Sequence, residues 1–379
     1  MRKSLLSVIS LVLLVIFVSA GNLRAQLIPK EKTMEAMLLA NKYFMEKWPD
    51  VGKVIITDRS RPSNIWTRAV YYEGLMDLYK LHPDTSLLNY ALRWGEFHKW
   101  GLRDGVKTRN GDNQCCGQTY IDLYLMDKSK TERIQDIKTC IDNMVATDKI
   151  DDWNWVDAIQ MAMPVFARLG YVYNDNKYYD RMFQMYMFTK TKHGDHGLYN
   201  PATGLWWRDK DFDPPYKTPG GKECYWSRGN GWVLAALVRT MDFLPKKSPY
   251  NKEFMKTYKE MVDALVKCQR QDGFWNASLL DETDFGGKEL TGTALFVYGM
   301  AWGINNGTLP KKKYQPVVEK AWNALVKDCV HPNGFLGWVQ GTGKQPSDSQ
   351  PVGYDNVPNF EDFGLGCFLL AGSEVYKLK

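Results

Sequence analysis

The chain has 379 residues and a formal net charge of +6. That length is enough for one large domain or two ordinary ones. The charge is mild, and no dense stripe of lysine and arginine is interleaved with aromatic residues, so the composition argues against a nucleic-acid-binding protein.

The N-terminus is typical of a secretory signal peptide. Met-Arg-Lys precedes an apolar run from Leu5 to Val18, and small residues follow through Ala20 and Ala25. The run is short for a membrane span, and no other such stretch follows it. We expect residues 1–25 to be removed and residues 26–379 to form the mature domain, in the periplasm or outside the cell and without a membrane anchor.

The seven cysteines do not indicate a disulfide framework or a zinc site. Their number is odd, their spacing is irregular, and there is no Cys-x-x-Cys pair or cysteine/histidine ladder. The adjacent Cys115 and Cys116 cannot easily bond to each other. We expect most of these thiols to be small buried apolar groups, with one disulfide left open.

Amphipathic runs of helical length recur along the whole chain, and strand-like alternation is scarce. The predicted helices span residues 33–47, 66–81, 86–100, 117–127, 132–146, 156–170, 177–190, 230–243, 252–268, 291–304, 314–328 and 362–376. Several connectors repeat a polar residue, a glycine and an aromatic residue, as in Asp272-Gly-Phe and Asn333-Gly-Phe. Repeated helix pairs without a dividing linker predict one all-α domain, an (α/α)6 barrel of six hairpins.

The long loops between these helices are rich in tryptophan, glycine and charge. They span residues 101–116, 147–156, 193–229 and 272–290, and many of the fourteen tryptophans fall in or beside them. In a helical toroid such loops gather at one end and build a cleft. Aromatic platforms beside carboxylates favour a glycan-active site.

Asp112 stands directly before the helix that contains Tyr120, in the segment Asn110-Gly-Asp-Asn-Gln-Cys-Cys-Gly-Gln. Asp157 falls in the first turn of the next inner-type helix, beside Trp153 and Trp155. Two carboxyl groups that share a cleft push their pKa values apart, so that one can hold a proton while the other stays charged. Ordinary helix capping is the alternative for both aspartates.

A third segment, Cys224-Tyr-Trp-Ser-Arg-Gly-Asn-Gly-Trp, opens a later helix. Arg228 at a helix N-terminus suits a bidentate grip on a carboxylate, and Trp226 and Trp232 offer stacking faces. A structural salt bridge is the alternative for Arg228.

Together, the helix that Asp157 opens, the Asp112 segment and the motif around Arg228 resemble the unsaturated rhamnogalacturonyl hydrolases of glycoside hydrolase family 105. These enzymes are related to the unsaturated glucuronyl hydrolases of family 88. The likeness covers essentially the whole mature chain, including Trp66 and Tyr72 in an early helix, which we count among the candidate substrate-binding residues.

The resemblance implies an acidic oligosaccharide substrate, a product of a polysaccharide lyase that carries a C4–C5 double bond in its non-reducing uronic acid. In this chemistry an acid protonates C4, water adds at C5, and the resulting hemiketal opens and expels the rest of the sugar. By match to the family motifs, Asp157 is the expected general acid/base. Asp112 is expected to bind sugar hydroxyls and tune Asp157, and Arg228 and Trp226 to hold the uronate. No metal or organic cofactor is indicated, because protonation and hydration require neither.

One departure from the family pattern is Arg208, in Gly204-Leu-Trp-Trp-Arg-Asp-Lys, where family members commonly carry a histidine. One interpretation of Arg208 and Lys210 is that they add positive charge suited to an acidic or sulfated glycan. The alternative is that both side chains are simply solvated. The competing interpretations are a family 88 glucuronyl hydrolase, another glycosidase or lyase of this shape, and a non-catalytic glycan-binding protein. The sequence leaves open whether the protein is a monomer or a homodimer.

Overall fold

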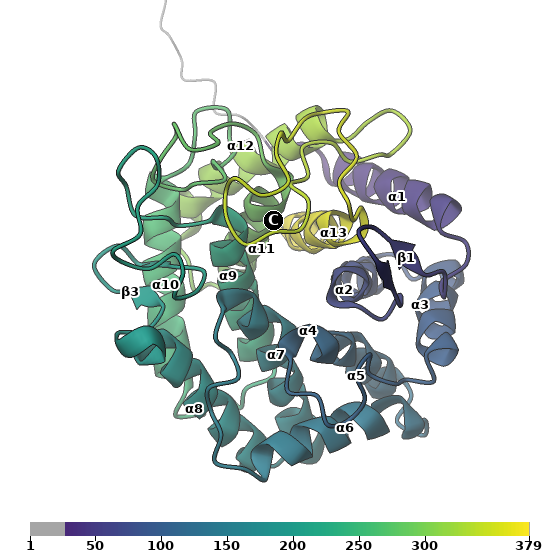
Figure 1. Ribbon diagram of the computed structural model, residues 1–379. Helices are drawn as coiled ribbons and strands as arrows, with labels where there is room; N and C mark the ends of the chain where they lie inside the picture. Colours follow the sequence, from purple (N-terminus) through teal and green to yellow (C-terminus); the bar gives the residue numbers. More distant parts are fainter. Residues whose placement is uncertain (1–26, 379) are drawn as a thin grey trace, which may run out of the picture.

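The computed structural model describes residues 27–378, which are mainly helical and form two concentric rings of helices (Figure 1). The outer ring contains α1 (Lys30–Lys47), α3 (Thr85–Phe97), α6 (Glu132–Val145), α8 (Asn176–Thr191), α10 (Asn251–Lys267) and α12 (Lys311–Cys329). The inner ring contains α2 (Trp66–Leu81), α5 (Cys116–Met126), α7 (Val156–Tyr173), α9 (Ser227–Met241), α11 (Leu290–Asn305) and α13 (Asp362–Lys377). The twelve predicted helices and the (α/α)6 barrel are confirmed.

The inner ring closes on itself, because each inner helix contacts the next and α13 returns to α2. A short helix, α4 (Gly111–Gln114), precedes α5 and supplies the contact with α7 at that point of the ring. The predicted signal peptide lies outside the described residues. No helix of residues 27–378 is long and apolar enough to cross a membrane.

The two rings differ in how their helices are buried. In α7, every residue from 156 to 170 is buried, which is the pattern of a helix surrounded by protein on all sides. In α10, the buried residues recur every three or four positions, as in Phe254, Tyr258 and Met261, so only one face is covered. The periodicity of the sequence therefore separates core helices from surface helices.

The cysteines lie mostly in the protein interior, which free cysteine favours. All seven are free thiols, and all but Cys268 are buried. The expectation of small apolar residues in the core is confirmed, and the structure contains no disulfide within the described residues.

Two glycines allow α2 and α13 to approach each other closely. A Cβ atom on Gly74 would stand 2.6 Å from the carbonyl oxygen of Gly366, and a Cβ atom on Gly366 would stand 2.3 Å from the carbonyl oxygen of Val70. Both distances are far below van der Waals contact, and the obstructing atoms belong to the backbone. The spacing of this helix pair therefore depends on glycine.

We expect Gly366→Ala to destabilise the barrel by about 2 kcal/mol or more, because the two helices must separate to admit the methyl group. Thermal unfolding followed by circular dichroism measures the effect. Gly105→Ala is the matched control: Gly105 has a φ of 71° and no atom within 4 Å of a built Cβ, so only the backbone conformation opposes the change. That strain costs about 1 kcal/mol. Equal losses of thermal stability in the two variants would contradict the close-packing argument.

The connections place all long loops at one end of the barrel. A chain passing from an inner helix to the next outer helix uses short turns, such as residues 82–84 and 174–175. A chain passing from an outer helix to the next inner helix uses long loops, such as residues 48–65, 98–110 and 192–226. The inner helices consequently run in one direction, and their N-termini meet the long loops at the same end. This arrangement confirms the predicted clustering of the loops.

Two small β-hairpins lie at the end of the barrel where the long loops gather. The strands β1 (Ile55–Ile56) and β2 (Ser60–Arg61) form one hairpin, and β3 (Tyr199–Asn200) and β4 (Leu205–Trp206) form the other, both antiparallel. The residues that follow β4 run directly alongside the start of α7, where an isolated bridge joins Trp155 to Asp209.

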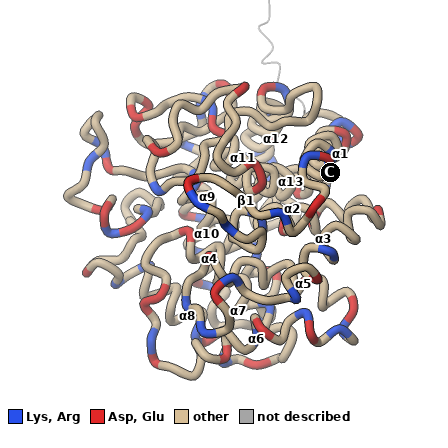
Figure 2. The backbone as a smooth tube through the Cα atoms, turned by 45° about the vertical axis from the view of Figure 1, so that its right-hand side comes forward, with Lys and Arg blue, Asp and Glu red and all other residues tan. Residues whose placement is uncertain are grey.

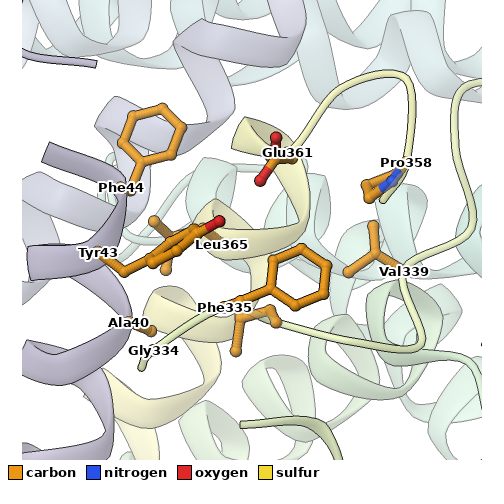
Figure 3. Close-up of a pocket in the computed structure, with 10 residues that line it drawn as sticks. Ala40, Tyr43, Phe44, Gly334, Phe335, Val339, Pro358, Glu361 and Leu365 are labelled. Carbon is orange, nitrogen blue, oxygen red and sulfur yellow. The ribbon is translucent and has the colours of Figure 1, made fainter. Parts of the chain in front are cut away.

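The first and last helices of the barrel lie side by side (Figure 1). Lys47 at the end of α1 forms an ion pair of 2.6 Å with Glu361, immediately before α13. Between them is a small apolar pocket, into which Tyr43, Phe335 and Leu365 project (Figure 3). Its only charged lining residue is Glu361, which is already paired, so this pocket belongs to the packing of the chain ends.

Candidate active site

Asp157 lies at the N-terminal end of α7 and faces the loop that follows β4. Trp155 is the N-cap of this helix, so Asp157 is a helical residue of the first turn and not the capping residue. Its side chain is 11% exposed. The N-terminus of α7 favours a negative charge at this position.

Arg208 is bound directly to Asp157. Its Nε donates a hydrogen bond to the Asp157 carboxylate at 3.1 Å, and its Nη1 donates to the carboxylate of Asp209. The backbone N–H of Val156 donates to the carbonyl oxygen of Arg208 at 2.9 Å, which fixes this loop against the start of α7. The residue that departs from the family pattern therefore contacts the expected catalytic acid.

Asp112 shares the electrostatic environment of Asp157. It lies in α4, whose N-cap is Asn110; the Asn110 side chain accepts a hydrogen bond of 2.8 Å from the backbone N–H of Asp112. The backbones of α4 and α7 touch here, since a Cβ atom on Gly111 would stand 3.2 Å from the Cα of Ala158. The N-cap of α4 is Asn110 and the N-cap of α7 is Trp155, so the alternative that Asp112 and Asp157 are helix caps is wrong for both.

The surroundings of Asp112 change how it holds a proton. Burial raises the pKa of Asp112 to about 7, and the negative charge of Asp157 acts in the same direction. The positive charges of Arg208 and Arg103 oppose this rise. Asp112 is thus poised to exchange a proton near neutral pH, whereas Asp157 is held in an ion pair.

The motif around Arg228 builds the wall of the site. Arg228 is 1% exposed, and its two terminal nitrogens donate to the carbonyl oxygens of Gln340 and Gly341 at 2.6 and 2.7 Å. Its guanidinium lies 4.4 Å from the ring centre of Trp226. In this arrangement both terminal nitrogens of Arg228 are bound to backbone carbonyl oxygens, whereas the sequence suggested that they grip a carboxylate.

Asn230, which the sequence analysis did not single out, has a similar function within the same motif. Its side chain accepts a hydrogen bond of 2.8 Å from the N–H of Trp206 and donates one of 3.0 Å to the carbonyl oxygen of Trp206. This pair of bonds ties β4, and hence the segment carrying Arg208, to α9. The motif around Arg228 therefore positions its neighbours through buried polar contacts.

Most of the aromatic residues that the sequence suggested as sugar platforms are buried. Trp153, Trp232 and Tyr72 have no exposed surface, and Trp226 is 1% exposed. Tyr72 stacks on Trp94 with ring centres 4.1 Å apart. These four are core residues in this structure, because a buried aromatic ring presents no surface to a sugar.

Two of the predicted aromatic residues remain partly exposed. Trp66, at the start of α2, meets Trp232 edge to face with ring centres 6.2 Å apart. Trp155 lines a pocket of about 240 Å³ next to Asp157. The other residues that line it are Asn154, His193, Arg208, Asp209, Lys210 and Asp211.

A second and larger hollow lies between the β1–β2 hairpin and the loop before α13. It has a volume of about 700 Å³ and is lined by Ile56, Thr57, Asp58, Arg61, Thr342, Pro358 and Asn359. Acidic and basic residues are interspersed along the described backbone, with no band of one sign in this view (Figure 2). The charge that a ligand meets is therefore set locally, by side chains such as Arg208 and Lys210.

Comparison with known proteins identifies the group to which this site belongs. A family model described as glycosyl hydrolase family 88 matches residues 37–379. A curated protein of Formosa agariphila, named unsaturated 3S-rhamnoglycuronyl hydrolase, is 30% identical over 398 residues that cover 100% of both chains. A protein of the same name from an Alteromonas species is 35% identical over 343 residues, 84% of this chain and 78% of the relative.

A comparison with solved structures points to the same family. A structure described as a glycosyl hydrolase of family 88 from Bacteroides vulgatus superposes with a TM-score of 0.82 at 31% identity and covers 92% of this chain and 99% of its own. The resemblance to the family 105 and family 88 hydrolases, drawn from the aspartate helix and the arginine motif, is confirmed.

Proposed function

The chain belongs to glycosyl hydrolase family 88 and is a glycoside hydrolase, and on that premise we propose that it removes an unsaturated uronic acid from the non-reducing end of lyase-generated oligosaccharides. The single observation that carries the proposal is the placement of two carboxyl groups in adjoining helices at one end of the barrel: Asp112 in α4, directly before the inner helix α5, and Asp157 in the first turn of the inner helix α7. The names of both curated relatives support an unsaturated uronyl group joined to rhamnose as the substrate.

In the proposed reaction, the carboxyl pair supplies one proton and receives it back. Asp157 delivers the proton to C4 of the unsaturated ring, and a water molecule adds its oxygen to C5 and returns a proton to the carboxylate. The hemiketal then opens and releases the remaining sugar. Asp112, with its raised pKa, holds a proton near neutral pH and donates a hydrogen bond to a sugar hydroxyl.

Arg208 is proposed to control the charge on this pair. In the free enzyme its guanidinium donates to Asp157. The carboxylate of an incoming uronate competes for the same donor, which frees Asp157 to take up a proton. Because this exchange is driven by the carboxylate of the substrate, the acid forms only when a uronate is bound.

The chain is proposed to act after export, with residues 1–25 removed as a signal peptide. The basic and apolar order of those residues supports this proposal.

Isotope incorporation tests the proposed chemistry. The enzyme is supplied with an unsaturated uronyl–rhamnose disaccharide in deuterium oxide enriched in oxygen-18, and loss of the ultraviolet absorbance of the double bond is followed. We expect one deuteron at C4 and the solvent oxygen at C5 of the released uronate. Solvent oxygen at the anomeric carbon would indicate an ordinary glycosidase, rising absorbance on intact polysaccharide a lyase, and binding without turnover a glycan-binding protein.

The raised pKa of Asp112 also predicts a pH dependence. Below about pH 7 the carboxyl keeps its proton, and above that value the proton is lost, so kcat/KM is expected to fall as the pH rises through about 7. Arg208→Gln removes a charge that lowers this pKa, and the fall is therefore expected to move to higher pH. The same change should reduce kcat/KM on the plateau by about tenfold.

Arg208→Lys is the control, because it keeps the positive charge while losing the planar fork. We expect its pH profile to stay close to that of the wild type. An Arg208→Gln profile that is unmoved, or moved to lower pH, would refute the coupling between Arg208 and the carboxyl pair.

A further inference from the structure

One carboxylate in the core of the barrel, that of Glu73, has no part in the proposed reaction. Glu73 lies in the inner helix α2, and its side chain has no exposed surface. Burial of a carboxylate is costly unless its oxygens accept hydrogen bonds or face a positive charge. The partners of Glu73 therefore indicate what this group does in the core.

The two oxygens of Glu73 bind one residue from each of the segments that carry the carboxyl pair. The thiol of Cys115 donates to Oε1 at 3.3 Å, and the side-chain amide of Gln160 donates to Oε2 at 2.9 Å. Cys115 lies three residues after Asp112. Gln160 lies three residues after Asp157 in α7. Because residues three apart are neighbours on one helix face, Glu73 holds both segments about one turn away from the carboxyl pair.

Two further hydrogen bonds tie the same point of α7 to its neighbours. The side-chain amide of Gln118 in α5 donates to the carbonyl oxygen of Gln160 at 2.9 Å. Arg239 in α9 donates to the side-chain oxygen of Gln118 at 2.8 Å and forms an ion pair of 3.3 Å with Glu73. All of these side chains are buried. Four inner helices thus meet in one polar group of residues, the Glu73 cluster, which contains Glu73, Cys115, Gln118, Gln160 and Arg239.

Charge balance alone does not account for the contacts of Glu73. As a counter-ion, Glu73 would need only to face Arg239, and Arg239 has a second carboxylate, that of Asp77, 3.7 Å from its Nη1. Nothing in this balance requires Glu73 to reach Cys115 and Gln160. Those two contacts lead to the segments of the carboxyl pair.

We propose that Glu73 is a positioning residue whose hydrogen bonds to Cys115 and Gln160 fix Asp112 and Asp157 relative to each other. The inference rests on the proposed function and adds to it a residue that touches neither the substrate nor the reacting atoms. A proton donor must lie within hydrogen-bond reach of the atom that it protonates. A displacement of about 1 Å can lower a rate about a hundredfold, so loosening these contacts should lower kcat more than it changes KM.

The first test breaks the contact with α7. Gln160→Met keeps the length of the side chain and removes the donor to Glu73. The side-chain oxygen of Gln160 has no hydrogen-bond partner within residues 27–378, so the bond to Glu73 is the only side-chain hydrogen bond lost. Gln269→Met is the matched control. Gln269 follows the outer helix α10, and its side chain donates to the carbonyl oxygens of Gly273 and Val317, outside the Glu73 cluster.

We expect Gln160→Met to lower kcat on an unsaturated uronyl–rhamnose disaccharide by about tenfold and to change KM by less than about twofold. Gln269→Met loses two hydrogen bonds, so it should lower the unfolding temperature at least as much and leave kcat near the wild-type value. An unchanged kcat in Gln160→Met would overturn the proposal, as would an equal fall of kcat in both variants.

The second test changes Glu73 itself. In Glu73→Gln the amide oxygen can accept from Gln160 and Arg239 while the amide nitrogen donates to the sulfur of Cys115, so the contacts remain without the charge. Glu73→Met keeps none of them. We expect kcat within about threefold of the wild type for Glu73→Gln and at least about tenfold lower for Glu73→Met. Equal losses would show that the charge matters and the contacts do not, which would overturn the positioning role. If Glu73→Met does not fold, Gln160→Met decides the question.

The proposed function and this inference fail in different ways. If the wild-type enzyme leaves the double bond of the disaccharide intact, the proposed function is refuted and the positioning role falls with it. If the wild-type enzyme consumes the double bond and Gln160→Met does so at the same rate, only the positioning role is refuted.

Discussion

Replacement of Asp157 by asparagine is expected to lower kcat on an unsaturated disaccharide by about a thousandfold, while KM changes by less than about threefold. A positioned general acid contributes a rate factor of about this size, and the amide retains the shape of the side chain without its proton. The measurement is the loss of ultraviolet absorbance at saturating substrate. Binding is checked separately by calorimetry with the same disaccharide.

Asp151→Asn is the matched control for this variant. Asp151 is an exposed carboxylate in the loop before α7, where it lies 2.9 Å from the ammonium of Lys149. The same chemical change at that position should leave kcat close to the wild-type value. If Asp157→Asn turned over substrate at the wild-type rate, the proton would have to come from another group, and Asp112 would be the first candidate.

Replacement of Asp112 by asparagine is expected to reduce kcat/KM by about a hundredfold and, at the same time, to stabilise the folded protein. The folded-state pKa of about 7 stands above the ordinary value of 3.8. The folded state therefore holds this proton more tightly than the unfolded state does. Relative stability from this group is fully present below the ordinary pKa and is lost as the pH rises through the folded value.

The sign of that effect makes the prediction specific. Near about pH 8 the wild-type protein must keep a partly buried carboxylate charged, whereas asparagine carries no such cost. We expect the asparagine variant to unfold about 2 °C above the wild type at that pH and at the same temperature near about pH 4. A lower unfolding temperature at both pH values would show that Asp112 is a structural residue.

The helices and their order followed from the sequence because burial imposes a period on the chain. In α10 the spacing of Phe254, Tyr258 and Met261 is visible without a structure, and in α7 the continuous apolar run marks an inner helix. Glycines and polar residues marked the turns. These local signals are sufficient for a barrel in which each helix contacts its neighbours in sequence.

The two aspartates were also accessible from sequence, because each opens an inner helix and the loops must meet at one end. The contacts of Arg228 could not be predicted from the sequence. A position at a helix N-terminus fixes where the arginine backbone lies, but not which acceptors its side chain reaches. Its partners, Gln340 and Gly341, lie more than a hundred residues away in the chain. The buried state of Trp153 and Trp232 was hidden for the same reason.

Arg208 illustrates the opposite case. A single residue that departed from the family pattern pointed to the loop that contacts the proposed catalytic acid, yet neither its ion pair with Asp157 nor the pocket formed with Asn154 and His193 was visible in the sequence. Those residues come from three separate segments. Only the close approach of the β4 segment to the start of α7 brings them together.

The contact between α1 and α13 has a consequence for how the protein folds. The helix α13 packs on both α1 and α2, although more than two hundred residues separate it from them in the sequence. The apolar faces of α1 and α2 that α13 covers stay open in any partly folded chain in which α13 has not docked. A chain truncated before Asp362 would lack the element that closes the ring, so we expect it to expose those faces and to aggregate.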